Sequence, residues 1–254
     1  MLQAFIIVLR EGFESFLIVA IIFAYLRKTN RSHLLPAVNW GVAASLLTST
    51  AFGYWILQGA SQPLWEGILG LASSVLVGAF VVHMWRMAPH LKQDMEKKLS
   101  RVTAPQDAKG MFAGIFIFTV FMITREGMET ALLLIQVHEP SRITGMILGL
   151  AAAAALAFVW VRVGHLINLK LFFQVTALFL MLFILQILLY SFHEFSEAGV
   201  LPNSEVWHVA TEPYSPEGIY GRWISLGMVA VCGVWLAIAW IKDKFIKANA
   251  KSHQ

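Results

Sequence analysis

Residues 2–26 read LQAFIIVLREGFESFLIVAIIFAYL, an apolar stretch with the charged phrase Arg10-Glu11-Gly12-Phe13-Glu14 near its middle. The phrase returns as Arg125-Glu126-Gly127-Met128-Glu129 inside a second apolar stretch, residues 111–137. Each stretch exceeds the roughly 20 residues that an α-helix needs to cross a membrane. Ionised side chains near the bilayer centre cost about 2.5–3.5 kcal/mol each, so six unpaired ones would cost on the order of 15–20 kcal/mol. We interpret the two phrases as parts of one cation site inside a membrane.

The composition of the whole chain supports a membrane protein. Of its 254 residues, 58% are hydrophobic and only 13% are charged, against about 25% charged in soluble domains. Arg10-Glu11 interrupts any signal-peptide core, and the lone Cys232 permits no disulfide framework. The sequence predicts an all-α polytopic fold with seven transmembrane helices, near residues 2–26, 36–57, 64–85, 111–137, 143–161, 169–192 and 222–241.

The positions of the basic residues predict the orientation. Most of the 19 Lys and Arg lie after the first span, between spans three and four, around the loop between spans five and six, and in the tail: Arg27, Lys28, Arg31, Arg86, Lys92, Lys97, Lys98, Arg101, Lys109, Arg162, Lys170, Lys242, Lys244, Lys247 and Lys251. Basic residues gather on the cytoplasmic side of membrane proteins. We therefore expect the N-terminus outside and the C-terminus inside.

The two charged phrases also indicate an internal repeat. Gly41-Val-Ala-Ala-Ser in the second span resembles Gly149-Leu-Ala-Ala-Ala in the fifth. Three spans per repeat would place the halves in opposite orientations, which is a common transporter plan. We expect one transmembrane permease domain over residues 1–254, with a first repeat over 1–90 and a second over 110–198. An outer loop over 199–221 and a seventh helix over 222–246, with a cytoplasmic tail, complete the chain.

On a helix, the charged side chains of each phrase are expected to lie on the same face. At about 100° per residue, Arg10, Glu11 and Glu14 fall within roughly a 100° sector, as do their counterparts Arg125, Glu126 and Glu129. If the helices face each other, four carboxylates and two guanidinium groups meet, with a formal charge of −2. Carboxylate oxygens suit hard cations, and arginine can orient and partly neutralise them. The alternative is a set of structural salt bridges, which needs no surplus of carboxylates.

Arg-Glu-x-x-Glu in the first and fourth of seven spans resembles the high-affinity iron permease family, which includes fungal oxidase-dependent permeases and bacterial members. The resemblance covers essentially the whole chain and extends to His193-Glu194-Phe195-Ser196-Glu197 after the sixth span. It implies inward transport of Fe³⁺ or Fe²⁺, with Glu11, Glu14, Glu126 and Glu129 handling the metal. Fungal members carry extracellular acidic motifs and work with a multicopper oxidase, and the short loops of this chain offer few counterparts.

A second polar region lies at the end of the sixth span. Gln186, Tyr190, His193 and Glu197 follow one helix face, and the loop beyond holds further acidic groups with one histidine, namely Glu194, Glu205, Glu212, Glu217 and His208. Such an acidic mouth would concentrate cations. His193 with Glu197, or Glu194 with Glu197, are candidate accessory metal ligands. The alternative is a solvated helix end.

Glu66 opens the third span, where the helix dipole favours a carboxylate. If it instead reaches the central cluster, the site gains a fifth carboxylate and suits a trivalent ion. Lys92 to Lys109 is expected to form a short amphipathic helix or a solvated linker.

The leading hypothesis is a secondary iron permease of the cytoplasmic (inner) membrane, with no resident cofactor. A permease for manganese or lead is the alternative, and an intramembrane enzyme is disfavoured because no His-Glu-x-x-His motif is present. The candidate partners are iron ions, the lipid bilayer, a periplasmic or extracellular iron-binding or iron-oxidising protein, and a second copy of the chain. No feature indicates nucleic acid.

Overall fold

The computed structural model describes residues 1–59, 63–87, 91–104, 107–137, 141–163, 169–215, 219–221, 223–235 and 238. Its regular elements over these ranges are all helices. They are α1 (Leu2–Lys28), α2 (Leu35–Gly59), α3 (Pro63–Met87), α4 (Leu91–Val102), α5 (Ala108–Ile135), α6 (Arg142–Val163), α7 (Leu169–Glu197), α8 (Ser204–Thr211), the 3-10 turns Ser32–Leu34 and Glu212–Tyr214, and an apolar helical segment Trp223–Trp235. The all-α prediction is confirmed.

The first six expected spans each coincide with a helix to within five residues, and the described part of the seventh, Trp223–Trp235, is helical. Among the described residues, three helical stretches are long and apolar enough to cross a membrane: Ala108–Ile135, Arg142–Arg162 and Leu171–Glu197. The segments Pro63–Ala79 and Trp223–Trp235 are apolar but shorter. The number of seven spans and their orientation remain predictions. The segment after the third expected span is the helix α4, and its Met95 and Leu99 are buried.

Local sequence explains where several helices begin and end. Asp107 caps α5, because its side chain accepts a hydrogen bond of 2.8 Å from the backbone N–H of Gly110. Arg27 and Lys28 occupy the last turn of α1, where positive charge is favoured by the helix dipole. α3 begins at Pro63, a residue that helices accept in their first turn.

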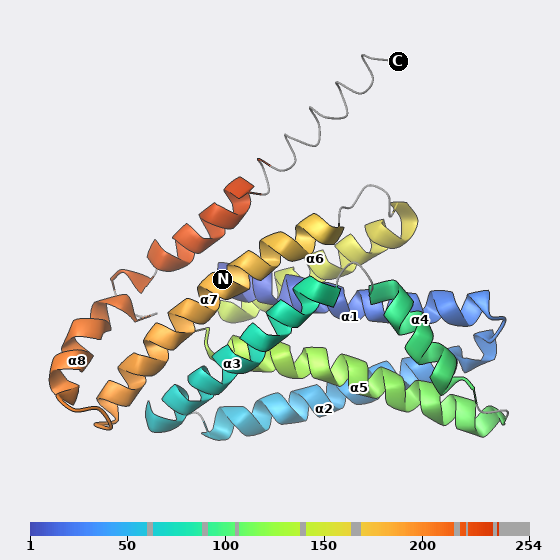
Figure 1. Cartoon of the computed structure of the whole chain (residues 1–254), viewed down its shortest axis with the longest axis horizontal. Helices are drawn as coiled ribbons and strands as arrows, with labels where there is room; N and C mark the ends of the chain where they lie inside the picture. The colour runs from blue at the N-terminus through green and yellow to red at the C-terminus, as the bar shows by residue number, and fades with distance from the viewer. Residues whose placement is uncertain are drawn as a thin grey trace, which may run out of the picture.

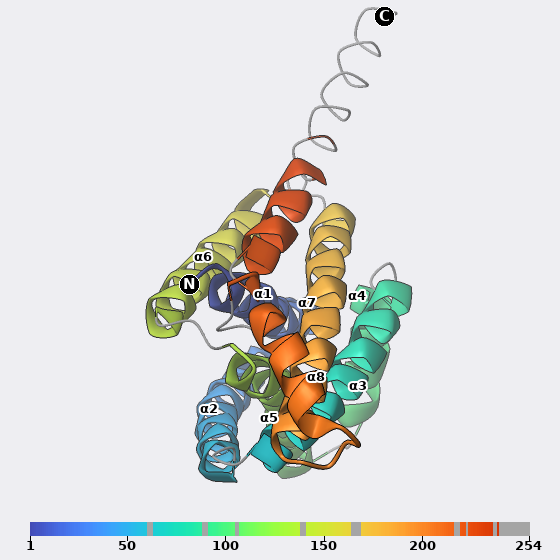
Figure 2. The same ribbon diagram turned by 90° about the vertical axis from the view of Figure 1, so that its left-hand side faces the viewer.

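The long helices pack in pairs. α1 lies chiefly against α6, α2 against α5, and α3 against α7, and α1 also contacts α5. Figure 1 shows α2 and α5 side by side with α1 above them, while α4 crosses near one end of α1 and α5. Figure 2, from the end of the molecule at which α8 lies, shows α1 surrounded by α5, α6 and α7. The two helices that carry the charged phrases are therefore direct neighbours.

Glycine allows the closest of these approaches. A Cβ atom added at Gly41 of α2 would lie 2.7 Å from Cβ of Thr119 in α5. One added at Gly149 of α6 would lie 2.7 Å from the backbone oxygen of Phe5 in α1. Both distances are far below ordinary carbon contacts of 3.5–4.0 Å. The helix pairs α2–α5 and α1–α6 consequently depend on glycine at these positions.

Apolar side chains fill the spaces between helices and also cover much of the outside. Phe179 and Phe183 of α7 stack at a centroid distance of 6.1 Å within a buried cluster. Outside, Leu47, Phe121 and Ile147 are 74%, 70% and 65% exposed. Apolar surface of this kind suits contact with lipid rather than water.

Candidate metal centre

The two charged phrases meet between α1 and α5. Glu11 of α1 and Glu126 and Glu129 of α5 each offer a carboxylate oxygen, and these three oxygens lie within 4.8 Å of one another. All three residues are buried, with at most 4% of their surface exposed. Carboxylates held this close repel one another strongly away from water. When all three are ionised, the arrangement therefore needs positive charge at or near the three oxygens.

Each arginine pairs with both carboxylates of its own helix. Arg10 forms an ion pair with Glu11 through Nη1, and its Nη2 lies 2.9 Å from Oε1 of Glu14. Arg125 donates a 2.9 Å hydrogen bond from Nε to Oε1 of Glu129, and its Nη2 lies 3.5 Å from Oε1 of Glu126. Arg10 is buried, whereas a quarter of the Arg125 side chain is exposed. Both guanidinium groups act as forks across two carboxylates.

The pairing does not balance the charge of the site. Four glutamates and two arginines give a formal charge of −2 when all are ionised. Oε2 of Glu11 and Oε2 of Glu126 are shielded from solvent and accept no hydrogen bond within the described part of the chain. A buried carboxylate oxygen without a donor is costly. A bound cation is a partner that would offset this cost.

Glu14 stands beside the three clustered carboxylates rather than among them. It is buried and ion-paired with Arg10. Sequence spacing treated the four glutamates as equivalent, and the structure divides them into a close trio and a fourth member held by an arginine.

Glu66 lies in the first turn of α3 and has a hydrogen-bond partner on α7. Tyr190 of α7 donates a 2.7 Å hydrogen bond to Oε2 of Glu66 at the start of α3. The same tyrosine also interacts with Glu194. Glu66 is thus not part of the carboxylate trio, and Glu66 and Glu194 meet at one hydroxyl.

A second group of potential ligands forms at the end of α7. His193 and Glu197 are joined there by His208 of α8, with one ligand atom from each residue within 4.8 Å of the others. His193 and Glu197 are candidate accessory ligands by sequence, whereas the sequence places His208 only in the acidic loop. Glu205 is exposed, and Glu217 lies outside the described residues.

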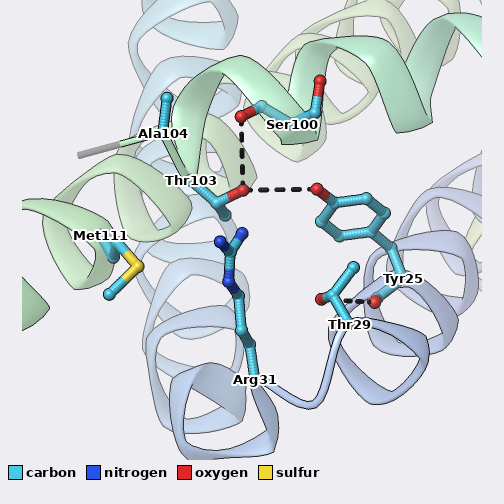
Figure 3. Close-up of a pocket in the computed structure, with 7 residues that line it drawn as sticks. All are labelled: Tyr25, Thr29, Arg31, Ser100, Thr103, Ala104 and Met111. Carbon is cyan, nitrogen blue, oxygen red and sulfur yellow. Dashed lines mark hydrogen bonds between the residues drawn. The ribbon is translucent and has the colours of Figure 1, made fainter. Parts of the chain in front are cut away.

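A cavity of about 480 Å³ lies at the C-terminal end of α1, between α1, α4 and the start of α5. Figure 3 shows the side chain of Arg31 pointing toward it. The hydroxyl oxygen of Tyr25 lies 3.3 Å from Oγ1 of Thr103. Its lining residues are Tyr25, Thr29, Arg31, Ser100, Thr103, Ala104 and Met111. The lining contains neither carboxylate nor imidazole, so we do not assign it a metal.

The chain is similar in sequence to iron permeases over most of its length. The model of the iron permease FTR1 family matches residues 1–237. Similar proteins include the ferrous iron permeases EfeU of Escherichia coli O6:K15:H31 and of Yersinia pestis, which are 28% and 27% identical to this chain. Both alignments cover 79% of this chain, and they cover 75% and 74% of the respective relatives. No solved structure matches. Because the family match spans nearly its full length, this chain belongs to the iron permease FTR1 family.

Proposed function

We propose that this membrane protein carries Fe²⁺ across the cytoplasmic (inner) membrane, and that Glu11, Glu14, Glu126 and Glu129 hold the ion in transit. The observation that carries the proposal is the meeting of three buried carboxylates from two helices within 4.8 Å, two of which have an oxygen without a hydrogen-bond donor among the described residues. A structural ion-pair network would match its donors and acceptors. A cation site leaves acceptors for its ion.

The charge of the cluster favours a divalent ion. Two arginines leave two negative charges on four glutamates, which Fe²⁺ would neutralise. A fifth carboxylate would have suited Fe³⁺, and Glu66 is bound to Tyr190 instead. The relatives named as ferrous iron permeases agree with this choice.

Arg10 and Arg125 would act as internal counter-ions. Each guanidinium group spans two carboxylates, so it stabilises the negative site before the metal arrives. When Fe²⁺ binds, it competes with the arginines for the same oxygens. This competition keeps binding weak enough for release, since a carrier that holds its ion too tightly cannot turn over.

The pairing of the helices supports an internal repeat of three helices, which we propose is inverted within a seven-span protein. Exchange of α1, α2 and α3 with α5, α6 and α7 leaves the set of helix pairs unchanged, because α1–α6 becomes α5–α2, and α3–α7 maps onto itself. We propose that the repeats run over residues 1–90 and 110–198 within one permease domain, with the N-terminus outside and the C-terminus inside. Alternating access would then move the repeats about the shared carboxylates.

Another divalent metal is the alternative substrate, because carboxylates alone discriminate weakly between Fe²⁺ and Mn²⁺ or Pb²⁺. An intramembrane enzyme has no support, since the chain belongs to a family of permeases. An iron-binding or iron-oxidising protein outside the membrane and a second copy of the chain remain the proposed protein partners.

The test is metal uptake by purified protein in liposomes, with the oxidation state of iron fixed by ascorbate or by ferric citrate. We expect uptake of Fe²⁺ that is lost in Glu126→Gln and preserved in the control Glu96→Gln on α4. Uptake of Fe³⁺ alone would contradict the choice of ion. Undiminished Fe²⁺ uptake by Glu126→Gln would contradict the site.

A further inference from the structure

The group of His193, Glu197 and His208 has the composition and the compactness of a metal site. His193 and Glu197 lie four residues apart, on one face of α7, and His208 comes from α8. One ligand atom from each lies within 4.8 Å of the others. Glu197 is exposed, so the group is open to ions from solvent, whereas His193 is buried.

The segment between α7 and α8 brings His208 next to His193. Gly199 follows α7 with a φ of +70°, and the N–H of Val200 donates to the carbonyl of Phe195, the pattern of a Schellman motif. Asn203, with a φ of +58°, then starts α8. These two left-handed residues reverse the chain, and α8 packs back along α7 (Figure 2).

His193 has a hydrogen-bond partner at one of its two ring nitrogens. Oγ1 of Thr211 lies 2.8 Å from Nδ1 of His193 and 2.8 Å from the carbonyl oxygen of Trp207. In the tautomer in which Nδ1 carries the proton and donates it to Thr211, Nε2 keeps its lone pair for a metal. Ligand histidines in metal sites are oriented by this kind of second hydrogen bond.

His208 lacks a partner for one ring nitrogen. Its Nδ1 is shielded from solvent and makes no hydrogen bond to any described residue. Its ring lies nearly parallel to that of His193, with a centroid distance of 4.6 Å and an angle of 19°.

From this geometry we propose that His193, Glu197 and His208 form a second metal site, which binds one divalent first-row cation. Two imidazole nitrogens and one carboxylate are a ligand set that Fe²⁺ accepts, and it differs from the all-carboxylate set between α1 and α5. The nitrogen ligands give this site a preference for transition metals over Mg²⁺ and Ca²⁺ that carboxylates lack.

Buried polar side chains lie between this site and the carboxylate trio. Gln186, two turns before His193 on α7, accepts a 2.9 Å hydrogen bond from Gln3 of α1. Gln3 precedes Glu11 by eight residues, about 12 Å along the helix. A role for the second site as the first stop of the transported ion rests on the proposed function, but binding at the site does not.

The test uses the full-length protein in detergent, with Glu126→Gln and Glu129→Gln introduced to disable the central site. Co²⁺ alone is added anaerobically, and its visible absorption and stoichiometry are measured. We expect one bound Co²⁺ per chain with bands of mixed nitrogen and oxygen ligation. Glu197→Gln, at an exposed position where folding is not at risk, should weaken binding at least tenfold. His208→Gln should do the same, and His33→Gln, at an exposed histidine elsewhere, should not.

Unchanged affinity and spectrum in Glu197→Gln would overturn the second site. So would the absence of Co²⁺ binding in the parent protein. Because the parent lacks two of the central carboxylates, the result does not depend on the proposed transport site. A protein that binds Co²⁺ here but does not transport iron would overturn the proposed function alone.

Discussion

Replacement of Glu126 by glutamine separates a metal site from a structural ion-pair network. In a structural network, the change removes an attraction and destabilises the fold. In a metal site, the change also removes the repulsion from Glu11 and Glu129, whose ligand oxygens lie within 4.8 Å. If the repulsions outweigh the attraction to Arg125, as expected of a site that lacks its cation, Glu126→Gln stabilises the metal-free protein, whereas a network in which attraction dominates is destabilised.

The distances give the size of the effect. At an effective dielectric constant of about 20, a repulsion at 4.8 Å, the upper limit for the separation of these oxygens, is worth about 3.5 kcal/mol, and the 3.5 Å attraction to Arg125 about 5 kcal/mol. Counting only Glu11 and Glu129 at that limit, Glu126→Gln relieves about 7 kcal/mol and loses about 5, a net stabilisation of about 2 kcal/mol. For a chain of this size that corresponds to a rise in Tm of roughly 4–8 °C.

The assay is thermal unfolding of purified protein in detergent, with chelator and with Fe²⁺ under anaerobic conditions. Metal at 100 times its Kd should add about 2.7 kcal/mol to the wild-type protein and much less to Glu126→Gln. Glu96→Gln, outside the site, should resemble the wild type in both conditions. A lower Tm for metal-free Glu126→Gln, together with an undiminished response to Fe²⁺, would refute the reasoning.

Three further substitutions test the metal site and the helix packing that supports it. Glu129→Gln should abolish Fe²⁺ uptake in liposomes while size-exclusion chromatography shows a folded protein, and normal uptake would remove Glu129 from the transport path. Arg10→Lys should lower uptake at least tenfold, because a single ammonium group cannot span two carboxylates as the guanidinium fork does; wild-type rates would mean that charge alone suffices. Gly149→Ala should lower Tm by several degrees, because its Cβ would lie 2.7 Å from the carbonyl oxygen of Phe5. Gly227→Ala, which meets nothing within 4 Å, is its control, and equal Tm values for both would show that α1 and α6 tolerate separation.

The helices and the main cluster could be predicted from sequence because both depend on short-range patterns. Apolar runs bounded by proline, glycine or charge mark the helices, and the paired phrases mark the carboxylates. The division of the glutamates could not be predicted in this way. Whether Glu14 or Glu11 joins the carboxylates of α5 depends on how α1 is rotated against α5, which is set by packing across the whole interface.

The contacts of Glu66 and His208 were also beyond sequence analysis. Tyr190 lies 124 residues from Glu66, and their hydrogen bond follows from the pairing of α3 with α7. His208 reaches His193 only because Gly199 and Asn203 both adopt left-handed backbones. Glycine at the end of a helix signals a turn, but it does not indicate the direction of the next helix.

The crossed pairing of helices has a consequence for biosynthesis. α1 packs chiefly on α6, which begins 114 residues after α1 ends, so a ribosome adding about 5–20 residues per second delivers this neighbour roughly 6–23 s later. In the proposed seven-span arrangement, a nascent α1 would hold three charged side chains in lipid without α5 or α6 until α5 begins, 80 residues after α1 ends. Arg10 can already bind Glu11 and Glu14, because all three belong to the same helix. These short-range ion pairs would then lower the cost of inserting α1 before the cluster exists.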